Sequence, residues 1–396
     1  MSLTDTPRSN RLHIGIFGKR NSGKSSLINA LTNQDIALVS EVPGTTTDPV
    51  YKTMEIHGIG PCVFIDTAGF DDEGTLGEMR VDKTKAATEK TDIALVLFTD
   101  LQIDKELQWI AHFKEQNTPV IAIINKSDCI PYIDELMESI EKNTHLTPLI
   151  VSAKEKTGIK TIHEAMIREL PEDYEVKSIT GSLAQTGDLV LLVMPQDIQA
   201  PKGRLILPQV QTLRDLLDKK CLVMSCTTDC LEQTLASLVK APDLIITDSQ
   251  VFKTVYEKKP ATSKLTSFSV LFAGYKGDIA TYVNGVHAID TLTEDSKVLI
   301  AEACTHAPLE EDIGREKIPR MLRQKIGSNL TIDIVSGSKF PEDVSSYDLI
   351  IQCGACMFNR KYVLSRIARA TSQEVPITNY GIVMAHLSGI LDKINY

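Results

Sequence analysis

Residues 18–25 read Gly-Lys-Arg-Asn-Ser-Gly-Lys-Ser and constrain the fold of this chain more than any other stretch. An apolar run, residues 12–17, precedes this loop, and a segment with helical character, residues 27–31, follows it. A strand, a glycine-containing loop and a helix in this order are the context of a phosphate-binding loop. The glycines let backbone N–H groups surround a phosphate, and the helix directs its positive end at the same anion. The pattern therefore predicts a nucleoside triphosphate site in an α/β domain.

Each position of this loop has an expected role. Lys24 is expected to reach the β- and γ-phosphates, and the Ser25 hydroxyl to ligate Mg²⁺. The other contacts to the nucleotide from this stretch are expected from Gly18, Asn21, Ser22, Gly23 and Ser26.

Two further motifs are expected beside the phosphates. Asp66-Thr67-Ala68-Gly69 closes an apolar run, so Asp66 is expected to hold Mg²⁺ through water and the Gly69 amide to contact the γ-phosphate. Upstream, Gly44-Thr45-Thr46-Thr47-Asp48 lies in a polar segment able to fold over the nucleotide, and we favour Thr46 as the threonine that completes the Mg²⁺ shell. Lys24, Thr46, Asp66 and Gly69 are thus the candidate catalytic residues.

Apolar runs alternate with charged, helix-compatible stretches along the first 170 residues. This alternation predicts βαβ units around a parallel sheet, with the chemistry on the loops at the carboxyl edge. The expected strands are residues 12–17, 63–65, 93–98, 120–124 and 149–151, and the expected helices are residues 77–90, 104–116, 134–142 and 161–170.

Two of these strand ends indicate the base. Asn125-Lys126-Ser127-Asp128 follows the fourth expected strand, and its aspartate can accept hydrogen bonds from guanine N1 and N2. Adenine does not offer this pattern of donors, so GTP is the expected nucleotide. Ser152-Ala153-Lys154 follows the next strand and suits a loop that packs on guanine O6.

The five motifs together resemble the Era/MnmE/EngA group of translation-factor-related GTPases, with their Gly-Thr-Thr-x-Asp segment. Phe70 stands where Ras-like enzymes place the glutamine that orients the attacking water. Asn21 matches the asparagine with which potassium-activated members hold K⁺ against the phosphates. The resemblance therefore implies slow GTP hydrolysis that is faster in K⁺ than in Na⁺.

The chain of 396 residues is too long for one core, and we expect three α/β domains. They are a GTPase domain (residues 1–172), a smaller domain (residues 183–262) and a third domain (residues 263–396). Expected strands in the second and third domains are residues 189–194, 221–224, 244–247, 268–272, 298–300, 330–335 and 349–351. Residues 194–210 contain three prolines and one glycine, which favours a rigid irregular loop.

Cysteines stand at two expected strand ends of the third domain, in Cys304-Thr305-His306 and in Cys353-Gly354-Ala355-Cys356. Cys304, Cys353 and Cys356 suit a cubane iron–sulfur cluster with one open or unusual position. Zinc is an alternative because Cys₃His, with His306, is also a valid tetrahedral set. A redox disulfide is the third interpretation.

A GTPase joined to such a domain resembles the HydF family of FeFe-hydrogenase maturation GTPases across essentially the whole chain. The family motif is Cys-x-His, about fifty residues, then His-Cys-x-x-Cys. Cys304, His306, Cys353 and Cys356 match it, while Gln352 replaces the second histidine. The fourth ligand is therefore open between water, another side chain and an incoming precursor, and His306 is either a ligand or a neighbour.

The resemblance implies a scaffold that holds a 4Fe-4S cluster, receives a diiron precursor from two radical-SAM maturases and delivers it to apo FeFe-hydrogenase. It also implies a homodimer formed by the middle domain, and GTP turnover that switches partner exchange. The alternative is an Era/MnmE-like GTPase in RNA modification or ribosome assembly, with a zinc-binding C-terminal domain.

Composition bears on the expected partners. The net charge of −10 offers no basic footprint for nucleic acid, and no apolar run approaches the ~18 residues of a membrane span. The polar N-terminus is not a secretory signal. We therefore expect a cytoplasmic protein that binds neither nucleic acid nor membrane.

Overall fold

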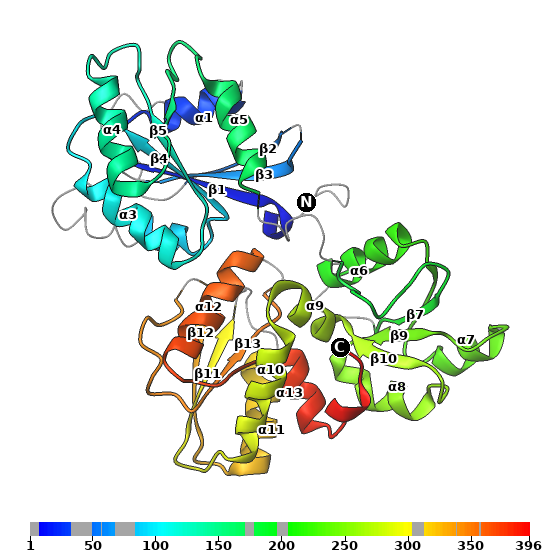
Figure 1. Ribbon diagram of the computed structural model, residues 1–396. Helices are drawn as coiled ribbons and strands as arrows, with labels where there is room; N and C mark the ends of the chain where they lie inside the picture. Colours follow the sequence, from blue (N-terminus) through cyan, green and yellow to red (C-terminus); the bar gives the residue numbers. More distant parts are fainter. Residues whose placement is uncertain are drawn as a thin grey trace. The chain divides into compact units, whose positions relative to one another are not determined.

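The computed structural model describes residues 8–32, 50–56, 58–67, 84–170, 178–195, 205–302, 313–337, 339–355 and 358–396. The chain forms two compact units, Met1–Val176 and Lys177–Tyr396, and both are α/β (Figure 1). Within the described ranges, no helix has the length and apolar character needed to cross a membrane.

The first unit is built on a six-stranded sheet with the order β2-β3-β1-β4-β5-β6. Its strands pair in parallel except β2, which lies antiparallel on the β3 edge. The bounds are β1 (Leu12–Gly18), β2 (Val50–Ile56), β3 (Gly60–Asp66), β4 (Ile93–Phe98), β5 (Val120–Ile124) and β6 (Leu149–Ile150). Every residue of β1 and β4 is buried, because helices cover both faces of the sheet, and this burial explains the uninterrupted apolar runs.

Adjacent residues of β1 contribute to opposite faces of this sheet. Ile16 packs in the core under α1 (Lys24–Thr32) and α5 (Ile159–Arg168), whereas Phe17 packs in the core under α3 (Asp104–Glu115) and α4 (Ile133–Thr144). β3 lies on one side of β1 and β4 on the other, so the loop after β1 opens where the winding of the sheet reverses. Ligands of doubly wound sheets bind at this position. The expected strands of this domain are confirmed, and in the described part of the expected 77–90 helix residues 84–88 are helical.

The second unit contains two parallel sheets of four strands, with the orders β10-β9-β7-β8 and β12-β11-β13-β14. The strands of the first are β7 (Leu189–Val193), β8 (Leu222–Cys226), β9 (Leu244–Thr247) and β10 (Lys264–Ser267). Those of the second are β11 (Lys297–Glu302), β12 (Thr331–Ser336), β13 (Leu349–Gln352) and β14 (Ile377–Asn379).

One apolar core connects these two sheets. It contains Leu191 and Ile245 from the first sheet and Ile300 and Ile350 from the second, with buried side chains of α9 and α13 among them. The helices of the unit are α6 (Leu207–Asp218), α7 (Leu231–Ser237), α8 (Phe252–Lys258), α9 (Phe268–Lys276), α10 (Ile279–Val286), α11 (Ile318–Ile326), α12 (Arg360–Ser372) and α13 (Tyr380–Leu387). The shared core makes the two sheets a single compact unit.

Two local expectations were wrong. Residues 268–272 form the start of α9, not a strand, because Ser267 caps the helix by accepting a hydrogen bond from the Val270 amide. An apolar run buried on all sides does not distinguish a strand from a helix by its periodicity. Residues 207–210 belong to the first turn of α6, where Pro208 occupies a position that helices tolerate and Gln209 Oε1 accepts from the Ile206 amide.

The sheet order also bears on the expected limit between residues 262 and 263. β10 begins at Lys264 and pairs with β9 over its whole length, so the sheet of the second domain continues beyond that limit. The connection from β9 to β10 runs through α8 and lies within one βαβ unit.

A close contact between α10 and β14 supports a stability prediction. A methyl group on Gly285 of α10 would lie 2.1 Å from the Ile377 carbonyl oxygen, whereas on Gly274 of α9 it would meet only Ile279 Cβ at 3.8 Å. We expect Gly285→Ala to destabilise the unit by about 1–3 kcal/mol through overpacking. Gly274→Ala is the control and should stabilise it by about 0.5–1 kcal/mol. Urea unfolding followed by circular dichroism measures both, and equal signs would contradict the packing account.

Candidate functional site

The phosphate-binding loop adopts a conformation that requires special residues. Asn21 has a φ of 61° and Gly23 a φ of 88°, both in the left-handed region. A side chain at Gly23 would also place its Cβ 2.4 Å from Asn125 Nδ2. Asparagine and glycine are the residues that adopt this region at least strain, so the loop matches its sequence.

Lys24 begins α1 and returns its ammonium to the loop. Its Nζ donates to the Gly18 carbonyl oxygen at 2.9 Å and to the Lys19 carbonyl oxygen at 2.8 Å, and the side chain is buried. Two backbone acceptors therefore orient the charge inside the loop that would receive the phosphates.

Ser25 and Asp66 meet where a divalent cation is expected. Ser25 Oγ donates to Asp66 Oδ2 at 2.7 Å, and Asp66 Oδ1 is buried without a hydrogen-bond partner among the described residues. Burial raises the pKa of Asp66, while the Ser25 hydrogen bond and the charges of Lys24 and Lys52 lower it. A hydroxyl beside an unpaired carboxylate oxygen fits Mg²⁺, which takes oxygen ligands and keeps several waters.

Sequence reasoning missed Lys52. Strand β2 pairs Lys52 with Phe64 and Val50 with Asp66. Lys52 and Asp66 therefore lie diagonally across from each other on the same face of the two strands. Lys52 Nζ is buried without a hydrogen-bond partner in the described chain, and burial lowers its pKa. Residues 50–56 were not predicted as a strand, so no pattern in the sequence placed this charge beside the Mg²⁺ position.

The base-binding motifs form one connected group. Asn125 Nδ2 donates to the Ser22 carbonyl oxygen at 2.8 Å, and Asn125 Oδ1 accepts from the Ala153 amide at 3.1 Å. Ser152 Oγ donates to Asp128 Oδ1 at 2.6 Å, and this hydrogen bond lowers the pKa of Asp128. An exposed, ionised aspartate is therefore held in one orientation beside the phosphate loop.

The remaining residues expected at this site have different environments. Lys126 has a φ of 62°, Ser26 is exposed, and the largely exposed Lys154 pairs with Glu155 at 3.7 Å. The Ser22 hydroxyl is buried and has no hydrogen-bond partner in the described part of the chain. Thr46, Gly69 and Phe70 lie outside the described residues, so their roles stay predictions.

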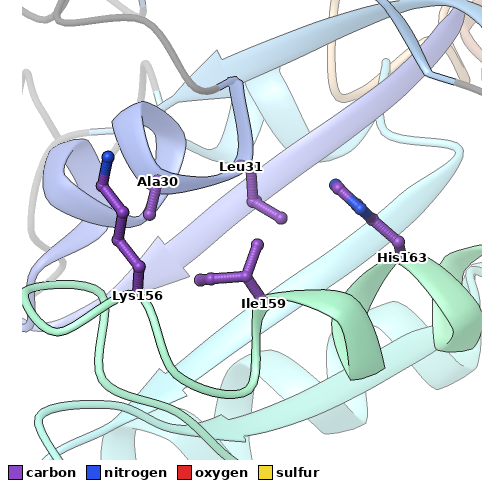
Figure 2. A pocket seen from close by; sticks show the side chains of 5 residues that line it. All are labelled: Ala30, Leu31, Lys156, Ile159 and His163. Carbon is purple, nitrogen blue, oxygen red and sulfur yellow. The ribbon is translucent and has the colours of Figure 1, made fainter.

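A hollow of about 270 Å³ lies at the far end of α1, away from this loop (Figure 2). It is lined by Ala30 and Leu31 of α1 and by Lys156, Ile159 and His163 at and before α5. Burial lowers the pKa of His163. None of the expected nucleotide ligands lines the hollow, so it is not the phosphate site.

The second candidate site lies at the carboxyl edge of the C-terminal sheet. Cys353 directly follows β13, whose parallel neighbour β11 ends at Glu302, two residues before Cys304. The two motifs were expected to follow strands, and the strands that precede them are parallel neighbours. Cys304, His306 and Cys356 lie outside the described residues, and their convergence on one metal stays a prediction.

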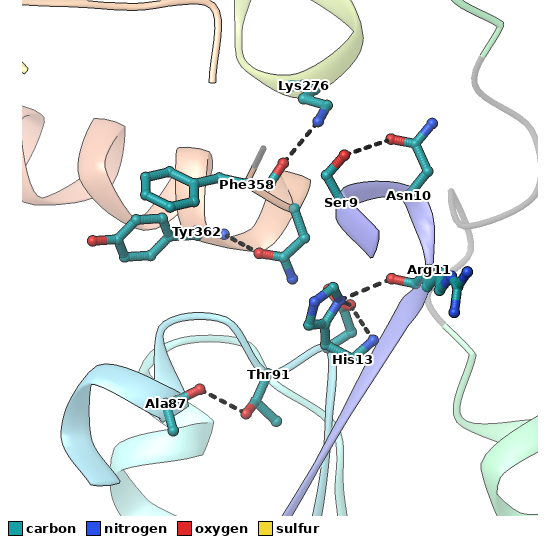
Figure 3. Close-up of polar contacts among 11 residues, drawn as sticks. Ser9, Asn10, Arg11, His13, Ala87, Thr91, Lys276, Phe358 and Tyr362 are labelled. Carbon is teal, nitrogen blue, oxygen red and sulfur yellow. Dashed lines mark hydrogen bonds and ion pairs between the residues drawn. The ribbon is translucent and has the colours of Figure 1, made fainter. Parts of the chain in front are cut away.

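A buried lysine positions the Cys353 loop. Lys276, 2% exposed at the end of α9, donates to the carbonyl oxygen of Ala355 at 3.3 Å. It also donates to the carbonyl oxygen of Phe358 at 2.7 Å, as Figure 3 shows. The Ala355 amide donates to Cys353 Sγ at 3.4 Å. Ala355, with a φ of 48°, adopts the left-handed backbone conformation within this loop. A positive charge and an amide donor therefore face the loop that carries the thiol.

Gln352 points into the interior of the unit. It is 1% exposed, and its Nε2 donates to the Tyr282 hydroxyl oxygen at 3.2 Å. Gln352 Oε1 has no hydrogen-bond partner in the described ranges. Burial raises the pKa of Tyr282, and the neighbouring Cys353 thiolate raises it further. The side-chain amide of Gln352, which stands where the expected family motif has its second histidine, is thus hydrogen-bonded to a buried tyrosine.

Three family models match successive parts of the chain. The family model of the 50S ribosome-binding GTPases matches residues 13–126, so the N-terminal unit is a GTPase domain. The Hydrogen maturase F dimerization domain matches residues 179–277, and the Hydrogen maturase F tetramerization domain matches residues 280–395. The chain belongs to the hydrogen maturase F family.

Curated relatives resemble the GTPase part. GTPase Der of Kosmotoga olearia is 35% identical over 185 residues, which are 43% of this chain and 41% of that protein. The tRNA modification GTPase MnmE of Nitrosomonas eutropha is 33% identical over 172 residues, which are 42% of this chain and 37% of that protein. This chain thus spans about two fifths of the length of each relative. A solved structure of Era with MgGDPNP and part of 16S ribosomal RNA matches 54% of this chain and 92% of its own at 20% identity and a TM-score of 0.37.

The orientation of Asp128 supports a test of base specificity. Asp128→Asn keeps an acceptor for Ser152 but offers one donor and one acceptor to the base, which matches xanthine and not guanine. We expect GTP affinity to fall about 10–100-fold, because a hydrogen bond to a charged group contributes about 1.5–3 kcal/mol. Binding of xanthosine triphosphate should rise. Fluorescent nucleotide titration measures both, with the exposed Asp134→Asn on α4 as control, and an unchanged preference for GTP would exclude Asp128 from base recognition.

Proposed function

We propose that this protein is a GTP-hydrolysing scaffold that holds a 4Fe-4S cluster on Cys304, Cys353 and Cys356 and delivers a diiron precursor to apo FeFe-hydrogenase. Membership of the hydrogen maturase F family supports this function. The observation that carries it is the position of Cys353, at the end of a strand whose parallel neighbour leads to Cys304.

In the GTPase domain, Lys24 would contact the β- and γ-phosphates, and Mg²⁺ would bind to Ser25, to Thr46 and through water to Asp66. Mg²⁺ and the Lys24 ammonium neutralise the negative charge that develops during phosphoryl transfer. The Gly69 amide would contact the γ-phosphate. Asn21 carries its side chain at an exposed, left-handed position of the loop, where an amide oxygen is available to a K⁺ ion.

In the C-terminal domain, the residues around Cys353 suit an anionic cluster. The Ala355 amide donates to the sulfur, and the Lys276 ammonium is fixed behind the loop by two carbonyl oxygens. Hydrogen bonds and positive charge near the sulfurs stabilise clusters held by thiolates. A cluster with three cysteine ligands keeps one iron for an exchangeable ligand, through which the diiron cargo would attach. His306 remains the candidate neighbour or ligand of that iron.

GTP turnover would act as the switch for partner exchange. Loops that contact the γ-phosphate order in the GTP state and relax after hydrolysis, which changes the surface offered to partners. The partners would be the two radical-SAM maturases that supply the precursor and the apo-hydrogenase that receives it.

The edge strand β8 supports a homodimer. β8 lies at the end of its sheet, and its Leu222 and Met224 side chains are 61% and 38% exposed. Leu222 donates its amide to the Asp188 carbonyl oxygen, and Cys226 accepts from the Met194 amide, so these residues face β7. By alternation, the backbone groups of Val223 and Ser225 face the free edge. A second copy of β8 pairing there would satisfy them.

Anaerobic purification with metal analysis and EPR tests the cluster. We expect iron, sulfide and a 4Fe-4S signal on reduction in the wild type and in Cys230→Ser, a control that changes an exposed thiol. Cys353→Ser should lose most of the signal because one thiolate ligand is removed. Zinc without iron in the native protein would overturn the carrier function in favour of the zinc-stabilised alternative. A Cys304→Ser variant that still matures apo-hydrogenase normally would exclude Cys304 as a ligand.

Substitution of Ser225 tests the dimer. Ser225→Pro removes an amide donor from the free edge of β8 and leaves the hydrogen bonds of Leu222 and Cys226 to β7 intact. We expect the dissociation constant of the dimer to rise about 5–150-fold, since each lost hydrogen bond contributes about 0.5–1.5 kcal/mol and one is lost on each copy. Light scattering measures the mass, and Ser225→Thr is the matched control. A dimeric Ser225→Pro variant would show that pairing occurs elsewhere.

The cation dependence of GTP hydrolysis tests Asn21. We expect turnover in KCl to exceed that in NaCl of equal ionic strength by on the order of tenfold, which corresponds to ~1.4 kcal/mol of transition-state stabilisation. Asn21→Gly tolerates the left-handed backbone and removes the amide oxygen, so its rates in the two salts should be equal. Equal rates in the wild type would rule out the K⁺ site.

A further inference from the structure

We propose that the C-terminal unit binds one divalent transition-metal ion on His287, Asp290 and His386, at a site separate from the cysteines. One potential ligand atom of each residue lies within 4.8 Å of the others. His386 Nε2 is 3.1 Å from Asp290 Oδ1, and His287 Nδ1 is 3.9 Å from Asp290 Oδ2. Tetrahedral ligand atoms with bonds of about 2 Å lie about 3.3 Å apart, so a small rotation of the exposed His287 side chain toward Asp290 would complete the site.

The three side chains come from two elements that lie side by side. His287 and Asp290 begin and end a short 3₁₀ turn, His287–Asp290, directly after α10, and His386 stands in the last turn of α13. α10 and α13 are in contact, and Figure 1 shows them together beside α11. The two imidazole rings meet edge to face, with centroids 5.6 Å apart.

The site lies at the opposite edge of the sheet from Cys353. The turn that carries Asp290 leads into the start of β11, whereas Cys353 follows the end of β13. β11 and β13 are parallel, so their starts and their ends occupy opposite edges. A metal at the histidines is therefore independent of the ion or cluster held by the cysteines.

The chemistry of the three donors selects the metal. Two imidazole nitrogens and one carboxylate oxygen suit Zn²⁺ and its neighbours Co²⁺ and Ni²⁺, while Mg²⁺ and Ca²⁺ prefer sites made only of oxygen. The side chains of His287 and Asp290 are 60% and 46% exposed, and that of His386 is 13% exposed. Water can therefore reach and complete the coordination of an ion that enters from the surface.

Lys325 is the natural competitor of such an ion. Its Nζ lies 2.5 Å from Asp290 Oδ1, at a side-chain exposure of 41%. The hydrogen bonds from Lys325 and His386 lower the pKa of Asp290. An arriving cation would use Oδ2 or displace the flexible ammonium into water, since a half-exposed ion pair contributes little.

A bound metal would connect the last turn of α13 to the 3₁₀ turn His287–Asp290, which precedes β11. The natural effect is stabilisation, because an ion that binds only the folded state shifts unfolding by mass action. The bound ion would therefore stabilise the fold of the C-terminal unit. This role of a metal would be separate from those at the GTPase site and at the cysteines.

Titration of the full-length, EDTA-treated protein with Co²⁺ tests the proposal. Thiolates also bind Co²⁺, so the readout is the difference between wild type and His287→Ala/His386→Gln. We expect the wild type to bind one more equivalent of Co²⁺ than the double variant. The difference spectrum should show the d–d bands of a site with nitrogen and oxygen ligands, without thiolate-to-cobalt charge transfer. His145→Asn, which removes a histidine from the GTPase domain at a left-handed position that asparagine tolerates, should bind like the wild type.

Two further measurements separate a metal site from a simple cluster of hydrogen bonds. Lys325→Met removes the competing cation and should tighten Co²⁺ binding about 2–5-fold, the equivalent of one exposed ion pair. Zn²⁺ at 100 times its Kd for this site should raise the melting midpoint of the wild type by about 5–10 °C more than that of the double variant, which keeps the cysteines. Equal Co²⁺ stoichiometry and spectra in wild type and a folded double variant, or a weaker affinity in Lys325→Met, would overturn the proposal.

Discussion

Both candidate sites depend on one constraint, the parallel pairing of buried strands. Parallel strands require helical crossovers, so the loops after the strands collect at one edge of the sheet. In the first unit this edge brings together the loop after β1, Asp66 at the end of β3 and Asn125 after β5. In the second unit the same rule places Cys353 beside the end of β11. Residues that lie far apart in the sequence become neighbours for a reason that does not depend on their own chemistry.

The polar groups at these edges are only partly satisfied by the protein. Asp66 Oδ1, the Ser22 hydroxyl and Gln352 Oε1 are buried without hydrogen-bond partners among the described residues. Each such group destabilises a fold by about 1–3 kcal/mol. Around them, Lys24 and Asn125 are held firmly by backbone partners. This combination of oriented donors and unpaired acceptors is typical of sites organised for a ligand rather than for stability.

Fixed positive charges accompany both sites in a protein whose net charge is −10. Lys24 lies inside the phosphate loop, and Lys276 lies behind the Cys353 loop. The buried Arg366 of α12 packs its guanidinium against the aromatic rings beside this loop, 5.1 Å from the centroid of Phe358 and 4.7 Å from that of Tyr362. Each candidate site therefore has a local positive charge, although the whole chain is acidic.

The sequence by itself determined the phosphate loop, the order of the GTPase motifs, the strands that precede them and the position of Cys353 after a strand. These features depend on consecutive residues: the left-handed backbone at Asn21 and Gly23, and uninterrupted apolar runs such as β4. Only the tertiary structure decided that residues 268–272 are helical, since burial on all sides hides the period that would reveal a helix.

The tertiary structure also decided which polar partners meet. Lys52 beside Asp66, Lys276 under the Cys353 loop, and His386 against Asp290 join segments that no local pattern connects. Their meeting depends on how helices and strands distant in the sequence pack together. Local sequence therefore determined the motifs and most of the elements, whereas long-range packing determined α9, β2 and the environment of each functional side chain.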